Sequence, residues 1–301
     1  MSVDPRRPFG RVLTAMVTPF ADDGSVDIDG AQRLASHLVD EGGNDGLVIS
    51  GTTGESPTTS DEEKDRLLRA VLDAVGARAT VIAGVGTNDT AHTVHLARAA
   101  EKAGAHGALV VAPYYSKPPQ AGLLAHFQTV ADATDLSCML YDIPGRTGVP
   151  INTETLQRLG EHPRIVAVKD AKGDLDASAQ VLAGTDLAYY SGDDKVTLPL
   201  LSIGAVGVVG VPTHLVGVRT TEMVLAYENG DVARALAIHR SLLPAFTGFF
   251  RTQGVILTKA ALRLVGLPAG PVRPPLVDAT EAEVTQLRLD LVAAGVELPA
   301  A

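Results

Sequence analysis

A lysine stands at the end of a short hydrophobic run. Residues 165–168 read Ile-Val-Ala-Val, a composition typical of a buried parallel strand, and Lys169 follows directly. One interpretation is a strand-end lysine whose stem extends along apolar surface to water. The other is a Schiff-base nucleophile, because partial burial lowers the pKa of an amine and leaves it free to attack a ketone.

Small polar motifs follow other hydrophobic runs. A turn of small residues, Gly-Thr-Thr-Gly-Glu at residues 51–55, offers backbone N–H groups and the hydroxyls of Thr52 and Thr53 to a carboxylate. Further motifs are Pro-Tyr-Tyr at 113–115, Tyr-Asp-Ile-Pro-Gly-Arg-Thr at 141–147, and Ser-Gly-Asp-Asp at 191–194. Each alone has an ordinary explanation as a turn, a strand-end aromatic residue or a surface arginine. They acquire a joint meaning only if the fold brings them to one face.

The order of the hydrophobic segments predicts such a fold. Short apolar runs alternate with amphipathic segments, which indicates parallel strands joined by right-handed helical crossovers. We expect strands at residues 13–18, 46–50, 80–84, 108–112, 137–141, 165–169, 187–191 and 206–211. Helices are expected between them, for example at 61–75 and at 90–103, where Asp89 or Thr90 would be the N-cap. Eight such units favour an α/β fold of the closed (β/α)8 TIM-barrel type, in which chemistry occurs at the carboxyl ends of the strands.

The pattern changes after the last strand. We expect only helices there, at residues 216–227, 231–250, 255–265 and 281–294, the last two separated by a Pro/Gly-rich segment at 266–275. The sequence therefore predicts two domains, a catalytic barrel in residues 1–230 and a C-terminal helical domain in residues 231–301.

The composition limits the classes of function. The formal net charge of −10 and the lack of basic runs argue against a nucleic-acid or membrane surface. Cys138 is the single cysteine, which excludes an intrachain disulfide framework and fits a reducing compartment. The first residues have no signal-peptide character, and no apolar stretch reaches the ~20 residues that a membrane helix needs. We therefore expect a cytoplasmic protein.

Several alternative chemistries find little support. No Gly-x-Gly-x-x-Gly motif opens a helix after a strand, so dinucleotide binding is not predicted. His92 and His95 share a helical face without a carboxylate partner at metal-binding spacing. Asp193 and Asp194, after the seventh strand, would repel a phosphate group. We expect neither a cofactor nor a metal.

The residue types suit imine chemistry on an α-keto acid. A neutral amine at Lys169 would give an electron-withdrawing iminium, so the neighbouring methyl group could lose a proton and become an enamine nucleophile. Tyr141 could transfer the protons that this path requires.

Taken together, the motifs at residues 51–55, 113–115, 141–147 and 168–170 resemble the dihydrodipicolinate synthase family. This family belongs to the pyruvate-dependent class I aldolases, which include N-acetylneuraminate lyase, and the resemblance extends from about Val12 through the helical tail. It implies a homotetrameric barrel enzyme that condenses pyruvate with L-aspartate-4-semialdehyde, on the route to lysine and diaminopimelate.

The resemblance also implies a role for each matching residue. Lys169 would be the Schiff-base lysine and Tyr141 the general acid/base, with Thr52 and Tyr115, the latter from a neighbouring subunit, as proton-relay partners. Thr53 would bind the pyruvate carboxylate and Arg146 the semialdehyde carboxylate. Gly192 and Val209 would line the pocket through their backbone.

Some positions depart from the family pattern. Asp142 replaces an asparagine, a change we expect to be tolerated, and Gly210 replaces a serine, which would loosen the pocket wall. Asp61, Lys64 and His92 stand where lysine-inhibited members have two histidines and a glutamate, so we predict weak or absent feedback by lysine.

Two other functions stay open at this point. One is a related aldolase, such as N-acetylneuraminate lyase or a 2-keto-3-deoxy sugar acid aldolase. Thr52-Thr53 argues against the first, which has Ser-Thr, and Arg146 argues against sugar-processing relatives. The other is a non-catalytic pyruvate sensor, although every catalytic position of the family is filled.

Overall fold

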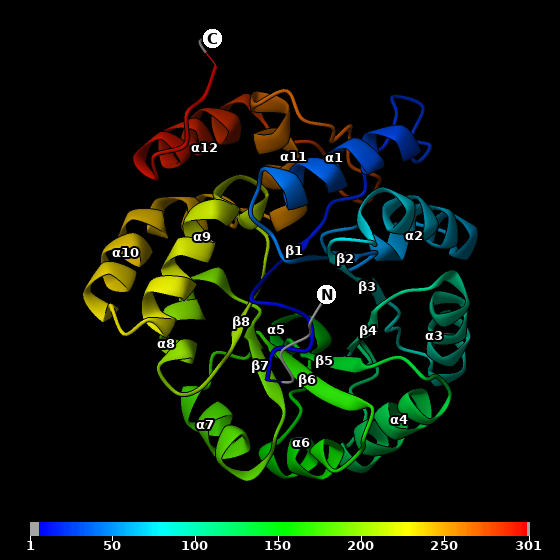
Figure 1. Ribbon diagram of the computed structural model, residues 1–301. Helices are drawn as coiled ribbons and strands as arrows, with labels where there is room; N and C mark the ends of the chain where they lie inside the picture. Colours follow the sequence, from blue (N-terminus) through cyan, green and yellow to red (C-terminus); the bar gives the residue numbers. More distant parts are fainter. Residues whose placement is uncertain (1–5, 300–301) are drawn as a thin grey trace.

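Eight parallel strands close into a barrel in the order of the sequence, from β1 next to β2 around to β8 next to β1. The structure, a computed structural model, describes residues 6–299 and is shown in Figure 1. The strands are β1 Val12–Ala15, β2 Gly46–Ile49, β3 Thr80–Gly84, β4 Gly107–Val111, β5 Cys138–Asp142, β6 Ile165–Asp170, β7 Ala188–Ser191 and β8 Gly207–Gly210. The predicted (β/α)8 barrel is therefore confirmed.

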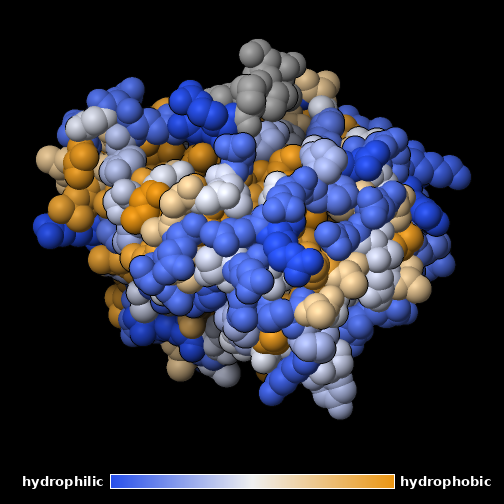
Figure 2. Space-filling model, turned by 90° about the horizontal axis from the view of Figure 1, so that it is seen from below, coloured by the Kyte–Doolittle hydropathy of each residue, from blue (hydrophilic) through white to orange (hydrophobic). Residues whose placement is uncertain are grey.

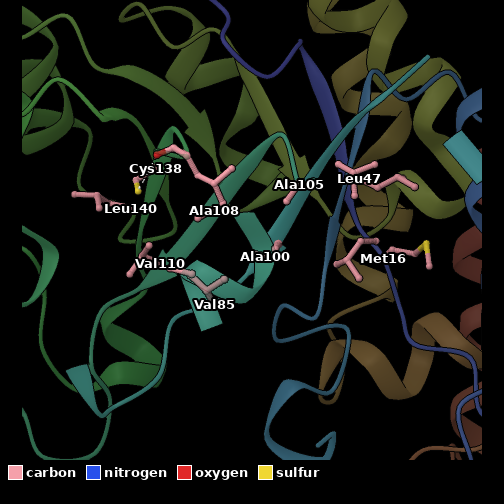
Figure 3. Close-up of a cluster of buried hydrophobic side chains, with 14 of the residues drawn as sticks. Met16, Leu47, Val85, Ala100, Ala105, Ala108, Val110, Cys138 and Leu140 are labelled. Atoms are coloured by element: carbon pink, nitrogen blue, oxygen red, sulfur yellow. Dashed lines mark hydrogen bonds between the residues drawn. The ribbon is translucent and has the colours of Figure 1, made fainter. Parts of the chain in front are cut away.

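Alternating side chains of β5 enter two different layers. Cys138 and Leu140 belong to the cluster between strands and helices, whereas Met139 and Tyr141 belong to a second cluster, which fills the barrel interior and continues into the packing of the C-terminal helices. Figure 3 shows the outer cluster, where Leu140 lies near Val110 of the neighbouring strand β4. This alternation fixes which residues of each strand can reach the lumen.

A ring of helices covers the barrel (Figure 1). The helices of the barrel are α1 Ile28–Asp40, α2 Asp61–Val75, α3 Thr90–Ala103, α4 Gln120–Asp132, α5 Pro144–Thr147, α6 Thr153–Gly160, α7 Leu175–Gly184, α8 Thr197–Leu201 and α9 Thr213–Glu228. The bounds predicted for α2 and α3 match the structure. The Asp89 carboxylate caps α3 by accepting a hydrogen bond from the Ala91 N–H, and a capping box of Ser60 and Glu63 starts α2.

Three helices follow the barrel: α10 Val232–Gly248, α11 Gly254–Leu264 and α12 Glu281–Ala293. Helix α10 packs against α9 and α12, and α11 packs against α9 and α12. In Figure 1, α11 and α12 lie along the top of the molecule and α10 lies at its left side. At the end of the barrel where the strands begin, Phe9 is buried, and its N–H donates to the Tyr190 hydroxyl.

The surface is mixed in character. Figure 2 shows one face on which hydrophilic residues dominate, with smaller hydrophobic areas between them. Within residues 6–299, none of the helices is both long and apolar enough to span a membrane.

Candidate active site

Lys169 points into the barrel lumen beside Tyr141. The two residues are register partners in the ladder between β6 and β5, so their side chains leave the sheet on the same face. The lysine Nζ lies 4.3 Å from the centre of the tyrosine ring. Both residues are buried, with exposed fractions of 4% and 6%. The amine of Lys169 and the phenol of Tyr141 thus lie side by side in the barrel, as the sequence predicted.

Burial changes the acidity of both groups. It lowers the pKa of Lys169 to about 8, because the ammonium is desolvated; the nearby Asp194 opposes this shift and Arg146 adds to it. Burial also raises the pKa of Tyr141 well above its ordinary value. Near neutral pH the tyrosine therefore keeps its proton and can donate it, and a larger fraction of Lys169 is present as the free amine than of a solvent-exposed lysine.

The amine faces a small cavity of about 60 Å³ at the carboxyl ends of the strands. Thr52 and Thr53 line it on one side and Gly192 on another. A β-carbon at Gly192 would lie 3.1 Å from Cγ of Lys169, so any larger residue would press on the lysine stem. A space of this size suits a small molecule of few atoms.

A larger cavity of about 410 Å³ adjoins the first. The two share Thr52, Tyr141 and Arg146 in their walls, so Arg146, carried by the short helix α5, stands between them. Tyr115 lines only the outer cavity; it is 89% exposed and its backbone is left-handed, with φ 74°. Within residues 6–299 the structure therefore keeps Tyr115 away from Lys169.

The second lysine of this region, Lys172, does not face the lumen. Its Nζ lies 3.4 Å from Oδ2 of Asp142, which is fully buried in β5. Asp142 follows Tyr141 along the strand and so points to the opposite face of the sheet. The Asp142 carboxylate also accepts a hydrogen bond from the Ile151 N–H. Asp142, which differs from the family pattern, is therefore paired with Lys172, and this pairing keeps Lys172 outside the barrel interior.

Two expectations about β8 need correction. Gly210 leaves no loose space, because a β-carbon there would lie 2.4 Å from Oδ1 of Asp194. Val209 is fully buried in the barrel, and the residue that lines the inner cavity at this strand end is Val211. Strand alternation explains the difference, since residues 209 and 211 share a face and only the later one reaches the cavity.

Sequence reasoning missed two parts of the site. Asp194 is buried beside Lys169, with its Oδ2 accepting a hydrogen bond from the Val211 N–H, and burial raises its pKa to about 7. The other part is the turn after α10 together with the first residues of α11, where Phe250, Gln253 and Val255 line the inner cavity. Residue types in that turn gave no signal, because only the docking of the helices brings it to the barrel mouth.

Comparison with known proteins identifies a family and several similar enzymes. The model of the dihydrodipicolinate synthetase family matches residues 8–294. The chain belongs to the dihydrodipicolinate synthetase family. It is 76% identical to the 4-hydroxy-tetrahydrodipicolinate synthase of Acidothermus cellulolyticus over 288 residues, which cover 96% of this chain and 93% of that protein.

Solved structures of the dihydrodipicolinate synthetase family have the same fold. The enzyme from Cyanidioschyzon merolae with lysine bound superposes with a TM-score of 0.94 at 44% identity, covering 96% of this chain and 99% of that one. The chloride-inhibited enzyme from Acinetobacter baumannii, in complex with pyruvate, gives 0.92 at 34% identity, covering 96% and 100%. The resemblance inferred from the motifs is confirmed.

Proposed function

We propose that the chain is a 4-hydroxy-tetrahydrodipicolinate synthase, which condenses pyruvate with L-aspartate-4-semialdehyde through a Schiff base on Lys169. The observation that carries the proposal is the desolvated amine of Lys169 against the Tyr141 ring at the floor of a cavity walled by Thr52 and Thr53. The names of relatives as similar as 76% and 65% in sequence support the same activity.

The residues of the inner cavity suit the first half of the reaction. Thr53 would bind the pyruvate carboxylate, which places the keto carbon at the lysine nitrogen. The amine attacks this carbon, and the oxygen leaves as water after it receives protons by way of Tyr141. The iminium then loses a methyl proton to give the enamine, with Thr52 relaying protons to and from Tyr141.

The outer cavity suits the second substrate. The enamine carbon attacks the aldehyde carbon of the semialdehyde, and the new alkoxide takes a proton. The amino group of this substrate can then attack the iminium carbon and displace the lysine, which closes the ring and frees the enzyme. Arg146 lines both cavities, and its planar fork suits the carboxylate of the incoming semialdehyde.

Replacing Arg146 by alanine should therefore separate the two half-reactions. We expect KM for the semialdehyde to rise by about ten- to a hundredfold, the value of a charge-assisted hydrogen-bond pair. Imine formation with pyruvate should change little. Steady-state kinetics and borohydride trapping measure the two effects, with Arg158→Ala, an exposed arginine of α6 outside both cavities, as the matched control. Equal losses in both half-reactions would assign Arg146 to pyruvate instead.

We also propose that the enzyme is a homotetramer in the cytoplasm. Tyr115 is exposed, has a left-handed backbone and lines the outer cavity, which supports the proposal that its ring enters a neighbouring subunit and completes the proton relay there. We also propose the division into a barrel of residues 1–230 and a helical domain of residues 231–301. This division concerns packing and not function, because Phe250 and Val255 of the helical part line the inner cavity.

Feedback by lysine is expected to be weak or absent. The Nε2 of His92 lies 2.8 Å from Oδ2 of Asp61, so the carboxylate that could attract a cationic amino acid already has a partner. Lys64, which donates to the Thr59 carbonyl, adds a repelling charge. Initial rates measured with added lysine should stay near the uninhibited value at sub-millimolar concentrations. Half-inhibition in that range would contradict this prediction.

The main rival, a related aldolase acting on sugars, is separated by one assay. Purified enzyme is given pyruvate with either L-aspartate-4-semialdehyde or N-acetylmannosamine. We expect turnover only with the semialdehyde. Turnover only with the sugar would refute the proposed function while leaving the Schiff base intact.

A further inference from the structure

A second lysine is more deeply buried than Lys169, and the mechanism does not use it. Lys259 of α11 is 0% exposed, and its Nζ lies 2.7 Å from Oε1 of Glu55, which is 3% exposed. Ions so completely removed from water lose most of their hydration, which is unfavourable for both charges. Such a pair is stable only where its attraction and its hydrogen bonds compensate for the lost hydration. The segments that the pair connects are therefore of interest.

The two ions belong to segments far apart in the sequence, and both segments reach the active site. Glu55 closes the Gly-Thr-Thr-Gly-Glu turn, and its N–H donates to the Thr52 carbonyl at 3.2 Å. Lys259 lies one helical turn beyond Val255, which lines the inner cavity. The ion pair therefore joins the wall with the two threonines to the wall built by the C-terminal helices.

Further contacts satisfy both ions through the segment that follows α11. Nζ of Lys259 also donates to the Pro271 carbonyl at 2.7 Å, and Oε2 of Glu55 accepts the Arg273 N–H at 2.8 Å. Lys259 and the Arg273 guanidinium both lie over the ring of Phe20, at 4.1 and 4.2 Å from its centre. The Pro/Gly-rich segment is thus fixed between the two ions.

Arg273 extends the connection along the loop after Glu55. Its guanidinium donates to the Thr58 carbonyl at 2.6 Å and to the Glu63 carboxylate at 2.8 Å. Glu63 belongs to the capping box of α2, so the loop is tied at its start and at its end. The loop needs such support, because Glu55 has a left-handed backbone with φ 54°, which is unfavourable for a residue with a side chain.

We propose that Glu55 and Lys259 are positioning residues that hold Thr52 and Thr53 in place for pyruvate, so that the C-terminal helices form a working part of the active site. This inference rests on the proposed function for its kinetic consequence. Its structural consequence, a loop held in place by a buried ion pair, does not depend on that function.

The decisive comparison is between losing one ion and losing both. In Lys259→Met the Glu55 carboxylate stays buried without its counter-ion, and the loop must move to hydrate it. In the double variant Glu55→Gln with Lys259→Met, a neutral amide can still accept the Arg273 N–H and the methionine packs on Phe20. We therefore expect the double variant to recover most of what the single variant loses.

Two readouts measure the effect. Hydrogen exchange should become faster at residues 51–59 in Lys259→Met, and KM for pyruvate should rise by about ten- to a hundredfold, because small displacements of a positioning group are costly. Lys102→Met is the matched control, since Lys102 is an exposed lysine in the last turn of α3 and lines neither cavity. It should change neither readout.

The outcomes separate this inference from the proposed function. Unchanged exchange and unchanged KM in folded Lys259→Met would overturn it, as would a double variant more impaired than the single one. If Lys259→Met does not fold, the same readouts on Glu55→Gln decide in the same way. The exchange measurement needs no substrate, so wild-type enzyme that forms no pyruvate adduct would refute the proposed function alone.

Discussion

Replacing Lys169 by methionine should reduce kcat/KM for condensation by roughly 10⁴-fold or more, as expected when a covalent nucleophile is removed. Methionine has nearly the same length and apolar stem, so the barrel should stay packed. The thermal midpoint should be unchanged or higher, because the wild-type protein buries a group that prefers water. Enzyme assays and thermal unfolding of the same preparation measure both effects.

Lys172→Met is the control for this experiment. Lys172 is three residues away and paired with Asp142, outside the barrel interior. Its loss should leave condensation within a few-fold of wild type, although burial of the unpaired Asp142 carboxylate should lower stability. If Lys172→Met lost activity and Lys169→Met kept it, the assignment of the nucleophile would be wrong.

The second large effect is expected for Tyr141→Phe. The phenylalanine ring keeps the contact with the lysine amine but has no proton to give, so kcat should fall by about 10²- to 10⁴-fold. Burial raises the pKa of Tyr141, and the wild-type phenol therefore keeps its proton at neutral pH. Rapid-quench measurement of imine formation and of condensation should show both steps slowed, since protons move in each.

Tyr190→Phe is the matched control for the loss of a phenol. Tyr190 flanks Lys169 on the other side, in β7, but its hydroxyl accepts from the Phe9 N–H at the closed end of the barrel. We expect lower stability by about 1 kcal/mol from the lost hydrogen bond, with catalysis nearly unchanged. Equal catalytic losses in both variants would mean that the Tyr141 hydroxyl has no special role.

Much of the barrel could be predicted because its signals are local. Short apolar runs alternate with amphipathic segments, and the end of each strand marks a position at the barrel mouth. This placed Lys169, Tyr141, Thr52 and Arg146 around one pair of adjoining cavities. Strand bounds differed by a few residues, for example Val12–Ala15 against the expected 13–18, because pairing with neighbours decides where a ladder ends.

Features that depend on docking could not be predicted in this way. Asp194 was expected to repel anions from a loop, whereas it is buried against Gly210. The helices after the barrel were predicted as a C-terminal helical domain, but no residue pattern indicated that the turn before α11 lines the inner cavity. Lys172 pairs with Asp142 on β5, and Lys259 pairs with Glu55, which is distant in the sequence, so no local pattern predicts either partner.

The most direct test of the central claim is to trap the imine and locate it. Enzyme is incubated with pyruvate, reduced with borohydride, digested, and mapped by mass spectrometry. We predict a single carboxyethyl adduct, on Lys169, and a trapping rate that rises with pH through about 8 as the buried ammonium loses its proton. An adduct on Lys172 or on another residue, or no adduct at all, would contradict the account.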